Sequence, residues 1–184
     1  IMVVQLSDTN AQGITVTGLG ESTANNYYHV SIPKMREEIE TYRQLIEDYS
    51  LATQPLEAGA EGTPEHLWAK LVPHFRESLF TLCALDIAAH DLYGKKVGQP
   101  LYQLWALNPA DAPTTNYTIG IDSIETMVQK MSAKPWPIYK IKLGTPEDIA
   151  IVRALRKHTD AVFRVDANCA WGVEETIKNS QELK

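Results

Sequence analysis

Residues 139–168 read YKIKLGTPEDIAIVRALRKHTDAVFRVDAN and hold two β-rich runs on either side of a helical stretch. Strands are predicted at residues 138–143 and 161–165, and Thr145-Pro146 opens the helix between them. Two strands joined by a crossover helix run parallel, since a connection of this length is typical of a βαβ unit. The stretch therefore indicates an α/β fold built on a parallel sheet.

The same alternation extends on both sides of this stretch. A strand is predicted at residues 117–121, followed by a helix that Asp122 caps, with Glu125 completing a capping box. A third helix is predicted to start at Val173, with Ile177 on its inward face. From residue 117 onward the order is βαβαβα, which is typical of a parallel sheet covered by helices.

Three residues mark a period in this half of the chain. Thr118, Lys142 and Asp166 are spaced 24 residues apart, and each falls toward the C-terminal end of its predicted strand. An equal step per βα unit is typical of a (β/α) barrel or a doubly wound sheet. Three units cannot close a barrel of eight strands, so either the sheet is open or further units exist. We predict that the natural polypeptide continues for about five more units.

The residues before this half predict an α+β arrangement. A β-hairpin is expected from strands at 1–6 and 14–17, and Gly18-Leu19-Gly20-Glu21 after it has the composition of a turn. Three helices are expected next, at residues 33–49, 63–73 and 76–93. The last helix is apolar almost all round, which predicts burial on most sides, and Gly94 has the position of its C-cap.

Prolines and turn formers cluster between the two halves, in Asn108-Pro109-Ala110-Asp111-Ala112-Pro113. Such a cluster between two structured stretches is typical of a linker. We therefore expect two domains, an α+β domain over residues 1–112 and a domain of three βα units over residues 113–184.

The composition is that of an ordinary globular protein. Of the 184 residues, 44% are hydrophobic and 22% are charged, which provides enough apolar material for a core. Asp and Glu number 23 against 17 Lys and Arg, and this net charge of −6, without a basic run, argues against a nucleic-acid partner or an anionic membrane surface. The sequence shows neither a membrane-spanning stretch nor the pattern of a signal peptide.

The two cysteines, Cys83 and Cys169, form no disulfide framework and no metal-ligand spacing. We therefore expect reduced thiols in a cytoplasmic protein. A small-molecule substrate fits this picture, and a homo-oligomer is compatible with it.

Lys140 and Lys142 alternate with Ile141 and Leu143 along one predicted strand, so the two lysines share a face. Two neighbouring ammonium groups disfavour each other's charged form, which suits a lysine to act as a general base. A solvated edge strand with its lysines outside would show the same alternation. The four residues alone leave both interpretations open.

Asp166 comes at the end of the next predicted strand, on the same face as Arg164. Sites of α/β proteins lie at such strand ends, and a carboxylate there is a hard ligand of the kind that Mg²⁺ prefers. A loop cap or an ion pair with Arg164 is the alternative. Because the carboxyl ends of neighbouring parallel strands converge, we expect Lys140, Lys142 and Asp166 to meet at one edge of the sheet.

Asp86 and His90 lie four residues apart on the buried helix, a spacing that two metal ligands could have. A pair of this kind is more often a satisfied hydrogen bond in a core, and we interpret it in that way. The sequence contains no nucleophile elbow, P-loop or dinucleotide fingerprint.

Taken in order, these motifs resemble the enolase superfamily, in its muconate-lactonizing and mandelate-racemase branch. Gly18-Leu19-Gly20-Glu21 resembles the Gly-x-Gly-Glu of that branch, and residues 84–104 resemble the helix of its capping domain. Lys140-Ile141-Lys142 and Asp166-Ala167-Asn168 resemble the residues of its site strands. Within the branch, residues 117–120 and 164–168 are most similar to dipeptide epimerases of the L-Ala-D/L-Glu type.

The resemblance implies a capping domain, residues 1–112, followed by the first βα units of a (β/α) barrel. It also implies a Mg²⁺-dependent epimerase that acts on dipeptides through an enediolate. Lys142 would be the base that removes the α-proton, with Lys140 as its neighbour, and Asp166 would be the first Mg²⁺ ligand. Thr118, Lys140 and Asn168 would lie close enough to touch the substrate.

The branch also needs two further acidic ligands and an opposite-face lysine on later strands, and a loop before Ile1 that covers the site. Residues 1–184 hold none of these, so the resemblance implies half a site, inactive alone and without specific Mg²⁺ binding. A cycloisomerase or an o-succinylbenzoate-type lyase would share the same half-site. From another class, a non-catalytic α/β module could bind a partner through its open strand edge.

Overall fold

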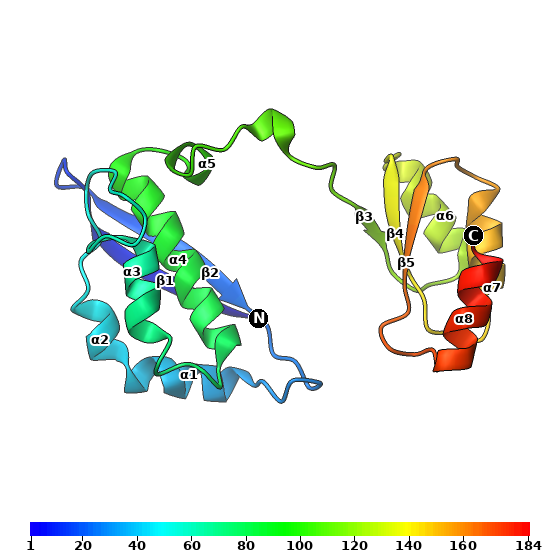
Figure 1. The fold of residues 1–184 in the computed structure, drawn as a ribbon, viewed down its shortest axis with the longest axis horizontal. Coiled ribbons are helices and arrows are strands. Elements are labelled where there is room, and N and C mark those ends of the chain that lie inside the picture. Colours follow the sequence, from blue (N-terminus) through cyan, green and yellow to red (C-terminus); the bar gives the residue numbers. More distant parts are fainter. The chain divides into compact units, whose positions relative to one another are not determined.

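A computed structural model describes residues 1–184, which divide into two compact units, Ile1–Asp111 and Ala112–Lys184 (Figure 1). The division lies within the proline-rich segment at residues 108–113. Each unit has its own cluster of buried hydrophobic residues. The α/β fold class is confirmed. None of the helices combines the length and the hydrophobicity that a membrane span requires.

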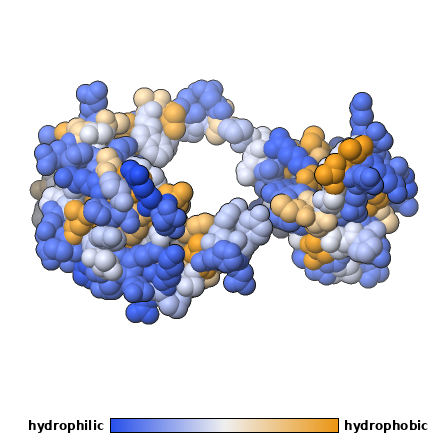
Figure 2. Space-filling view, turned by 60° about the horizontal axis from the view of Figure 1, so that its bottom comes forward, coloured by the Kyte–Doolittle hydropathy of each residue, from blue (hydrophilic) through white to orange (hydrophobic).

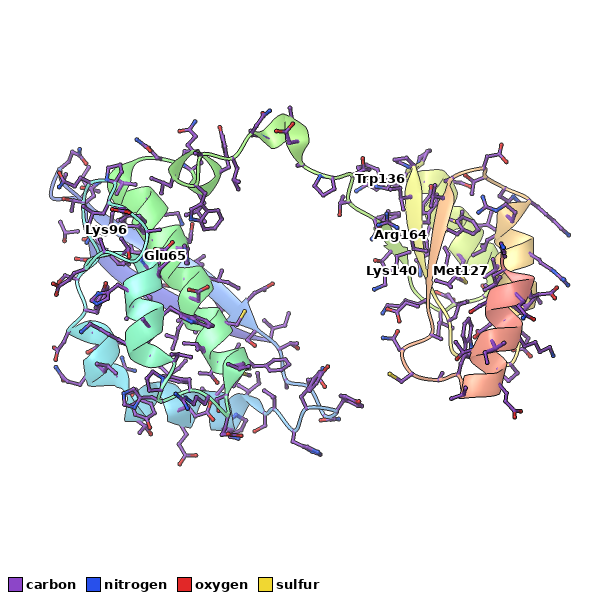
Figure 3. All side chains as sticks on the ribbon, in the orientation of Figure 1. Glu65, Lys96, Met127, Trp136, Lys140 and Arg164 are labelled. Atoms are coloured by element: carbon purple, nitrogen blue, oxygen red, sulfur yellow. The ribbon has the colours of Figure 1, made fainter.

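The first unit packs helices against a two-stranded hairpin. Strands β1 (Met2–Thr9) and β2 (Thr15–Ser22) pair antiparallel, with Val4 opposite Gly20. The helical segments are α1 (Ile32–Thr41), α2 (Arg43–Glu47), α3 (Pro64–Leu71), α4 (Leu79–Val97), α5 (Leu101–Leu104) and the 3-10 turn η1 (Pro109–Asp111). Helix α4 lies along the hairpin, and its buried Lys96 pairs with Asp8 of β1 (Figures 1 and 3).

The segment Gly18-Leu19-Gly20-Glu21 is part of β2, so its interpretation as a turn is wrong. Its glycines serve a close approach of helix α4. A Cβ atom on Gly20 would overlap the carbonyl oxygen of Ala84 and lie 2.7 Å from the amide nitrogen of Ala88. Gly18 stands in the same relation to Ala88 and Leu92. The strand therefore needs residues without a side chain where the helix backbone crosses it.

We expect Gly20→Ala to lower the free energy of unfolding of the first unit by about 2–3 kcal/mol, because backbone atoms, which cannot rotate away, occupy the space of the new methyl group. Urea denaturation followed by circular dichroism measures the change. Gly120→Ala is the matched control, since nothing lies within 4 Å of a Cβ atom at that position. An unchanged free energy of unfolding of the first unit in Gly20→Ala would show that α4 can move away from β2 at little cost.

Three expectations for the helices of this unit need correction. The helix expected at residues 33–49 breaks at Tyr42, whose ring packs against His74 and Phe75. Helix α4 continues through Gly94 and ends at Gly98, which has the left-handed φ of 71° that favours glycine at a C-cap. The helix is also less enclosed than expected, since its Leu79, Cys83 and Ile87 are exposed at a spacing of four residues.

Asp86 and His90 form the hydrogen-bonded pair that we expected rather than a metal site. His90 Nδ1 lies 3.0 Å from the carbonyl oxygen of Asp86 and 3.3 Å from its Oδ1, while His90 Nε2 lies 3.4 Å from Oε1 of Glu65 on α3. Burial alone disfavours the charged imidazolium, but the hydrogen bonds and charge of Asp86, with the charge of Glu65, outweigh it and raise the pKa of His90 to about 9.

This raised pKa predicts a pH dependence of stability. The imidazolium of His90 stabilises the folded state fully below its unfolded pKa of about 6.5, and this contribution is lost as the pH rises through about 9. The side chain is only 14% exposed, so we expect a contribution of about 3 kcal/mol. Urea denaturation of the wild type and of His90→Gln at pH 6 and pH 10 should show a difference that shrinks by this amount. A pH-independent difference would contradict the charged pair, and His158→Gln, at an exposed position, serves as control.

The second unit is a three-stranded parallel sheet in the order β3-β4-β5. Its elements are β3 (Tyr117–Ile119), α6 (Ile124–Ala133), β4 (Ile138–Lys142), α7 (Asp148–Arg156), β5 (Val162–Asp166) and α8 (Val173–Glu182). Ser123 rather than Asp122 caps α6, and its Oγ accepts the N–H of Thr126. Asp122 instead pairs with Lys130. The βαβαβα order is confirmed, and the sheet is open.

One face of this sheet carries the core. Tyr139 and Ile141 of β4 and Ile119 of β3 are buried together with Met127 of α6 and Leu155 of α7. Residues between them on each strand point to the opposite face.

Several hydrophobic residues of β5 and α8 lie outside this core and are exposed to solvent. Ile177 is 55% exposed and Val173 is 79% exposed, so the expectation that Ile177 faces inward is wrong. Val162 and Val165 of β5 are exposed as well, because β5 is the edge strand of the sheet. Hydrophobic patches interrupt the otherwise hydrophilic surface of this unit (Figure 2).

Candidate active site

The candidate site lies on the face of the sheet that is opposite the core. Strand β4 lies between β3 and β5, so the interpretation of its lysines as an edge-strand pattern is wrong. The register places Thr118, Lys140 and Arg164 in one row across the three strands. Lys142 and Asp166 form the next row toward the C-terminal ends. Lys140 and Arg164 point away from the side of the sheet that the helices cover (Figure 3).

Lys140, Lys142, Asp166 and Asn168 form a polar cluster with Asp166 at its centre. Its Oδ2 lies 2.8 Å from Lys140 Nζ and 2.9 Å from Lys142 Nζ, and its Oδ1 accepts the N–H of Asn168 at 3.0 Å. The hydrogen bonds from Lys140, from Lys142 and from the backbone of Asn168 hold the pKa of the Asp166 carboxyl well below its usual range.

The alternation of the sequence suggested two neighbouring ammonium groups without a countercharge. The structure shows a different arrangement. A carboxylate within hydrogen-bond distance of both Nζ atoms provides a shared countercharge. Asp166 pairs with these lysines rather than with Arg164, which donates to Oδ1 of Asn116 at 2.9 Å.

Asn168 joins the same cluster, since its Oδ1 accepts a hydrogen bond from Lys142 Nζ at 2.8 Å. Asn168 and Cys169 have φ angles of 48° and 64°, a left-handed conformation that residues with side chains seldom adopt. The structure thus brings together Lys140, Lys142, Asp166 and Asn168. Thr118 lies beside Lys140 in the sheet and is exposed, and its side chain makes no hydrogen bond.

Sequence reasoning missed Asp148 and Trp171, which form a hydrogen bond between the segment after β4 and the segment after β5. Asp148 is only 2% exposed although it is a carboxylate in the first turn of a helix. The signal that could have identified it is the Gly144-Thr145 loop just before it, whose N–H groups need acceptors. Nothing in the sequence indicates its contact with Trp171, which depends on tertiary structure.

The oxygen chemistry of Asp166 suits a hard cation, but the chain does not supply a full ligand set. No group of three or more His, Cys, Asp or Glu side chains that could hold a metal ion exists in residues 1–184. The other acids near in sequence, Glu174 and Glu175, are exposed on α8. Asp166 can therefore contribute one ligand to a Mg²⁺ ion, and the residues of this chain do not complete a site around it.

The fold of the chain matches the folds of two solved enzymes. The structure matches that of a muconate lactonizing enzyme from Klebsiella pneumoniae with a TM-score of 0.73 at 22% identity, over 98% of this chain and 50% of that one. It matches a dipeptide epimerase from Cytophaga hutchinsonii, solved with Mg and the dipeptide D-Ala-L-Val, with a TM-score of 0.70 at 22% identity, over 98% of this chain and 48% of that one. At this identity the likeness concerns the fold. It confirms an α+β capping domain followed by the first βα units of a barrel.

The sequence comparison identifies more similar relatives than the fold comparison does. The chain is 54% identical over 168 residues to an L-Ala-D/L-amino acid epimerase of Flavobacterium johnsoniae. The aligned residues make up 91% of this chain and 47% of the relative. It is 52% identical over 180 residues to an L-Ala-D/L-amino acid epimerase of a Maribacter species, over 96% of this chain and 50% of the relative. No family model matches the chain.

Together these likenesses confirm the resemblance to the enolase superfamily and, within it, to dipeptide epimerases. The close relatives are racemases and epimerases, isomerases that act on amino-acid derivatives. The chain spans about half the length of the curated relatives that it matches.

Proposed function

We propose that this chain contributes half of the active site of a Mg²⁺-dependent epimerase that acts on dipeptides. The observation that carries the proposal is the cluster of Lys140, Lys142, Asp166 and Asn168 at the carboxyl ends of adjacent parallel strands. The cluster occurs in a chain that is 54% identical to an L-Ala-D/L-amino acid epimerase. Strand ends of this kind are where barrel enzymes carry their catalytic residues.

In this proposal Lys142 is the base. As a general base, Lys142 would accept the α-proton of the substrate on its side-chain nitrogen, so that the C–H bond breaks, an N–H bond forms, and the electron pair passes into the adjoining carboxylate as an enediolate. Lys142 is the lysine nearer the C-terminal end of β4, and its Nζ is already held by Asp166 and Asn168. Return of a proton to the opposite face requires a second acid, which residues 1–184 do not provide.

The other cluster residues take part by binding and by charge. Asp166 would hold Mg²⁺, which when bound supplies positive charge beside the substrate carboxylate. Lys140, 2.8 Å from the same carboxylate oxygen, adds positive charge on that side. Asn168 and Thr118 offer polar groups at the edge of the cluster to a substrate amide or carboxylate.

The test is exchange of α-protons with solvent. A polypeptide that combines this chain with the remainder of the barrel is incubated in D₂O with Mg²⁺ and L-alanyl dipeptides, and proton NMR follows the α-proton signals. We expect deuterium at one α-carbon together with the appearance of the epimer. Conversion of cis,cis-muconate to a lactone without any such exchange would instead support the cycloisomerase, whose fold the chain shares.

A further inference from the structure

We propose that Asp148 is a positioning residue that ties the loop after β4 to the loop after β5 and so holds Lys142 and Asn168 in contact. We refer to Asp148 and its hydrogen-bond donors Gly144, Thr145 and Trp171 as the clamp. Its importance for a reaction rests on the proposed function, whereas its effect on the geometry of the cluster does not.

Asp148 uses both of its carboxylate oxygens on these two loops. From the loop after β4 it accepts the N–H of Gly144 at 2.9 Å, and the N–H and hydroxyl of Thr145 at 2.8 and 2.9 Å. From the loop after β5 it accepts the indole N–H of Trp171 at 2.7 Å. The donors Gly144 and Thr145 precede α7, so an acidic residue that only closed the Gly144-Thr145 turn onto the start of the helix would satisfy them. The indole contact goes beyond that local role.

The carboxylate is charged where it lies. Burial by itself would raise its pKa, but the hydrogen bonds from the backbone of Thr145 and Gly144 and from Trp171 outweigh burial and leave the pKa of Asp148 below its ordinary value. Charged hydrogen bonds of this kind are stronger than neutral ones and favour one geometry.

The two loops also touch directly at Gly144. Its φ of 131° is one that only glycine adopts readily, and a Cβ atom there would lie 3.2 Å from Cβ of Ala170 and 3.5 Å from the carbonyl oxygen of Ala167. At the strand ends the N–H of Leu143 donates to the carbonyl oxygen of Asp166 at 3.0 Å. The clamp therefore closes a junction in which the two backbones already meet.

The residues that the clamp holds are strained. Asn168 and Cys169 are both in the left-handed region, and such a turn persists only where its surroundings determine it. Trp171 follows this turn by two residues, so its anchorage on Asp148 fixes the end of the turn. Asn168 in turn presents its Oδ1 to Lys142. Three hydrogen bonds, Gly144 to Asp148, Trp171 to Asp148 and Lys142 to Asn168, therefore close a ring with the two short chain segments 142–144 and 168–171.

The first test measures amide hydrogen exchange by NMR in the 184-residue chain. Trp171→Phe removes the indole N–H and keeps an aromatic ring, and Asp148→Asn keeps the size of the side chain. We expect each to speed exchange of the Asn168 amide about tenfold relative to the buried Ile141 amide of the same unit. Trp136→Phe is the matched control, since it removes a 2.7 Å indole hydrogen bond to Thr115 elsewhere in this unit.

The outcomes separate a clamp from ordinary destabilisation. If Asp148 acts through Trp171, the double variant exchanges no faster at Asn168 than the faster single variant. An unchanged ratio of Asn168 to Ile141 exchange in Trp171→Phe, or an equal change in Trp136→Phe, would overturn the proposal.

The second test uses the complete enzyme. We expect Trp171→Phe to lower kcat about tenfold with KM changed less than about twofold, because the substrate contacts remain while Lys142 is less well placed. Trp136→Phe should change neither, and equal effects of the two variants would count against the clamp. A wild-type protein that epimerises no dipeptide would refute the proposed function and leave the exchange experiment as the test of the clamp.

Discussion

Lys142→Ala should abolish exchange of the substrate α-proton with solvent in the complete enzyme, and Lys140→Ala should weaken it less. Removal of a general base is expected to cost about 10²–10⁴-fold in rate. Both lysines contact Asp166, but only Lys142 also contacts Asn168, and it lies nearer the strand ends. Proton NMR of the dipeptide in D₂O measures the exchange rate of each variant.

Lys178→Ala is the control for this comparison, because Lys178 is an exposed lysine of the same unit on α8. It should exchange the α-proton as fast as the wild type. If Lys142→Ala retained the wild-type rate, another residue would be the base. If Lys140→Ala were the more damaged variant, the roles of the two lysines would be reversed.

Asp166→Asn should remove the Mg²⁺ dependence of the complete enzyme together with its activity. The 184-residue chain itself should show no specific Mg²⁺ binding, even with Asp166 intact. Its carboxylate lies within 2.9 Å of two lysine Nζ atoms, whose charge opposes a cation, and Mg²⁺ requires several hard ligands in an octahedral array. Isothermal calorimetry of the short chain and metal titration of the activity of the complete enzyme measure the two effects.

Asp160→Asn is the control for Asp166→Asn, since Asp160 is exposed in the same unit. It should leave the metal dependence of the activity unchanged. A tight, stoichiometric Mg²⁺ site in the short chain would refute the half-site and require ligands that the structure does not bring together.

The sequence was sufficient to predict the strands of the second unit and the meeting of their charged residues. The alternation along β4 and β5 places side chains on one face, and parallel pairing brings the strand ends together. What the pattern could not predict was how the charges pair. Whether Asp166 contacts Arg164 or the lysines depends on the register between strands, which pairs Lys142 with Asp166 and Lys140 with Arg164.

Two of the features that sequence reasoning missed have a common cause, because they depend on contacts between distant segments. Gly18 and Gly20 have turn composition, and only the crossing of α4 explains why they stand in a strand. Asp148 resembles an ordinary helix-capping acid until Trp171, from the next βα unit, is placed beside it.

The two faces of strand β4 have separate tasks. Tyr139 and Ile141 pack into the hydrophobic core of the second unit, while Lys140 and Lys142 point to the other side and are partly exposed. Mutations can therefore alter one set without disturbing the other, provided that they keep the alternation. Such a division favours evolvability, because residues of the polar rows can be replaced while the buried residues that stabilise the scaffold are kept.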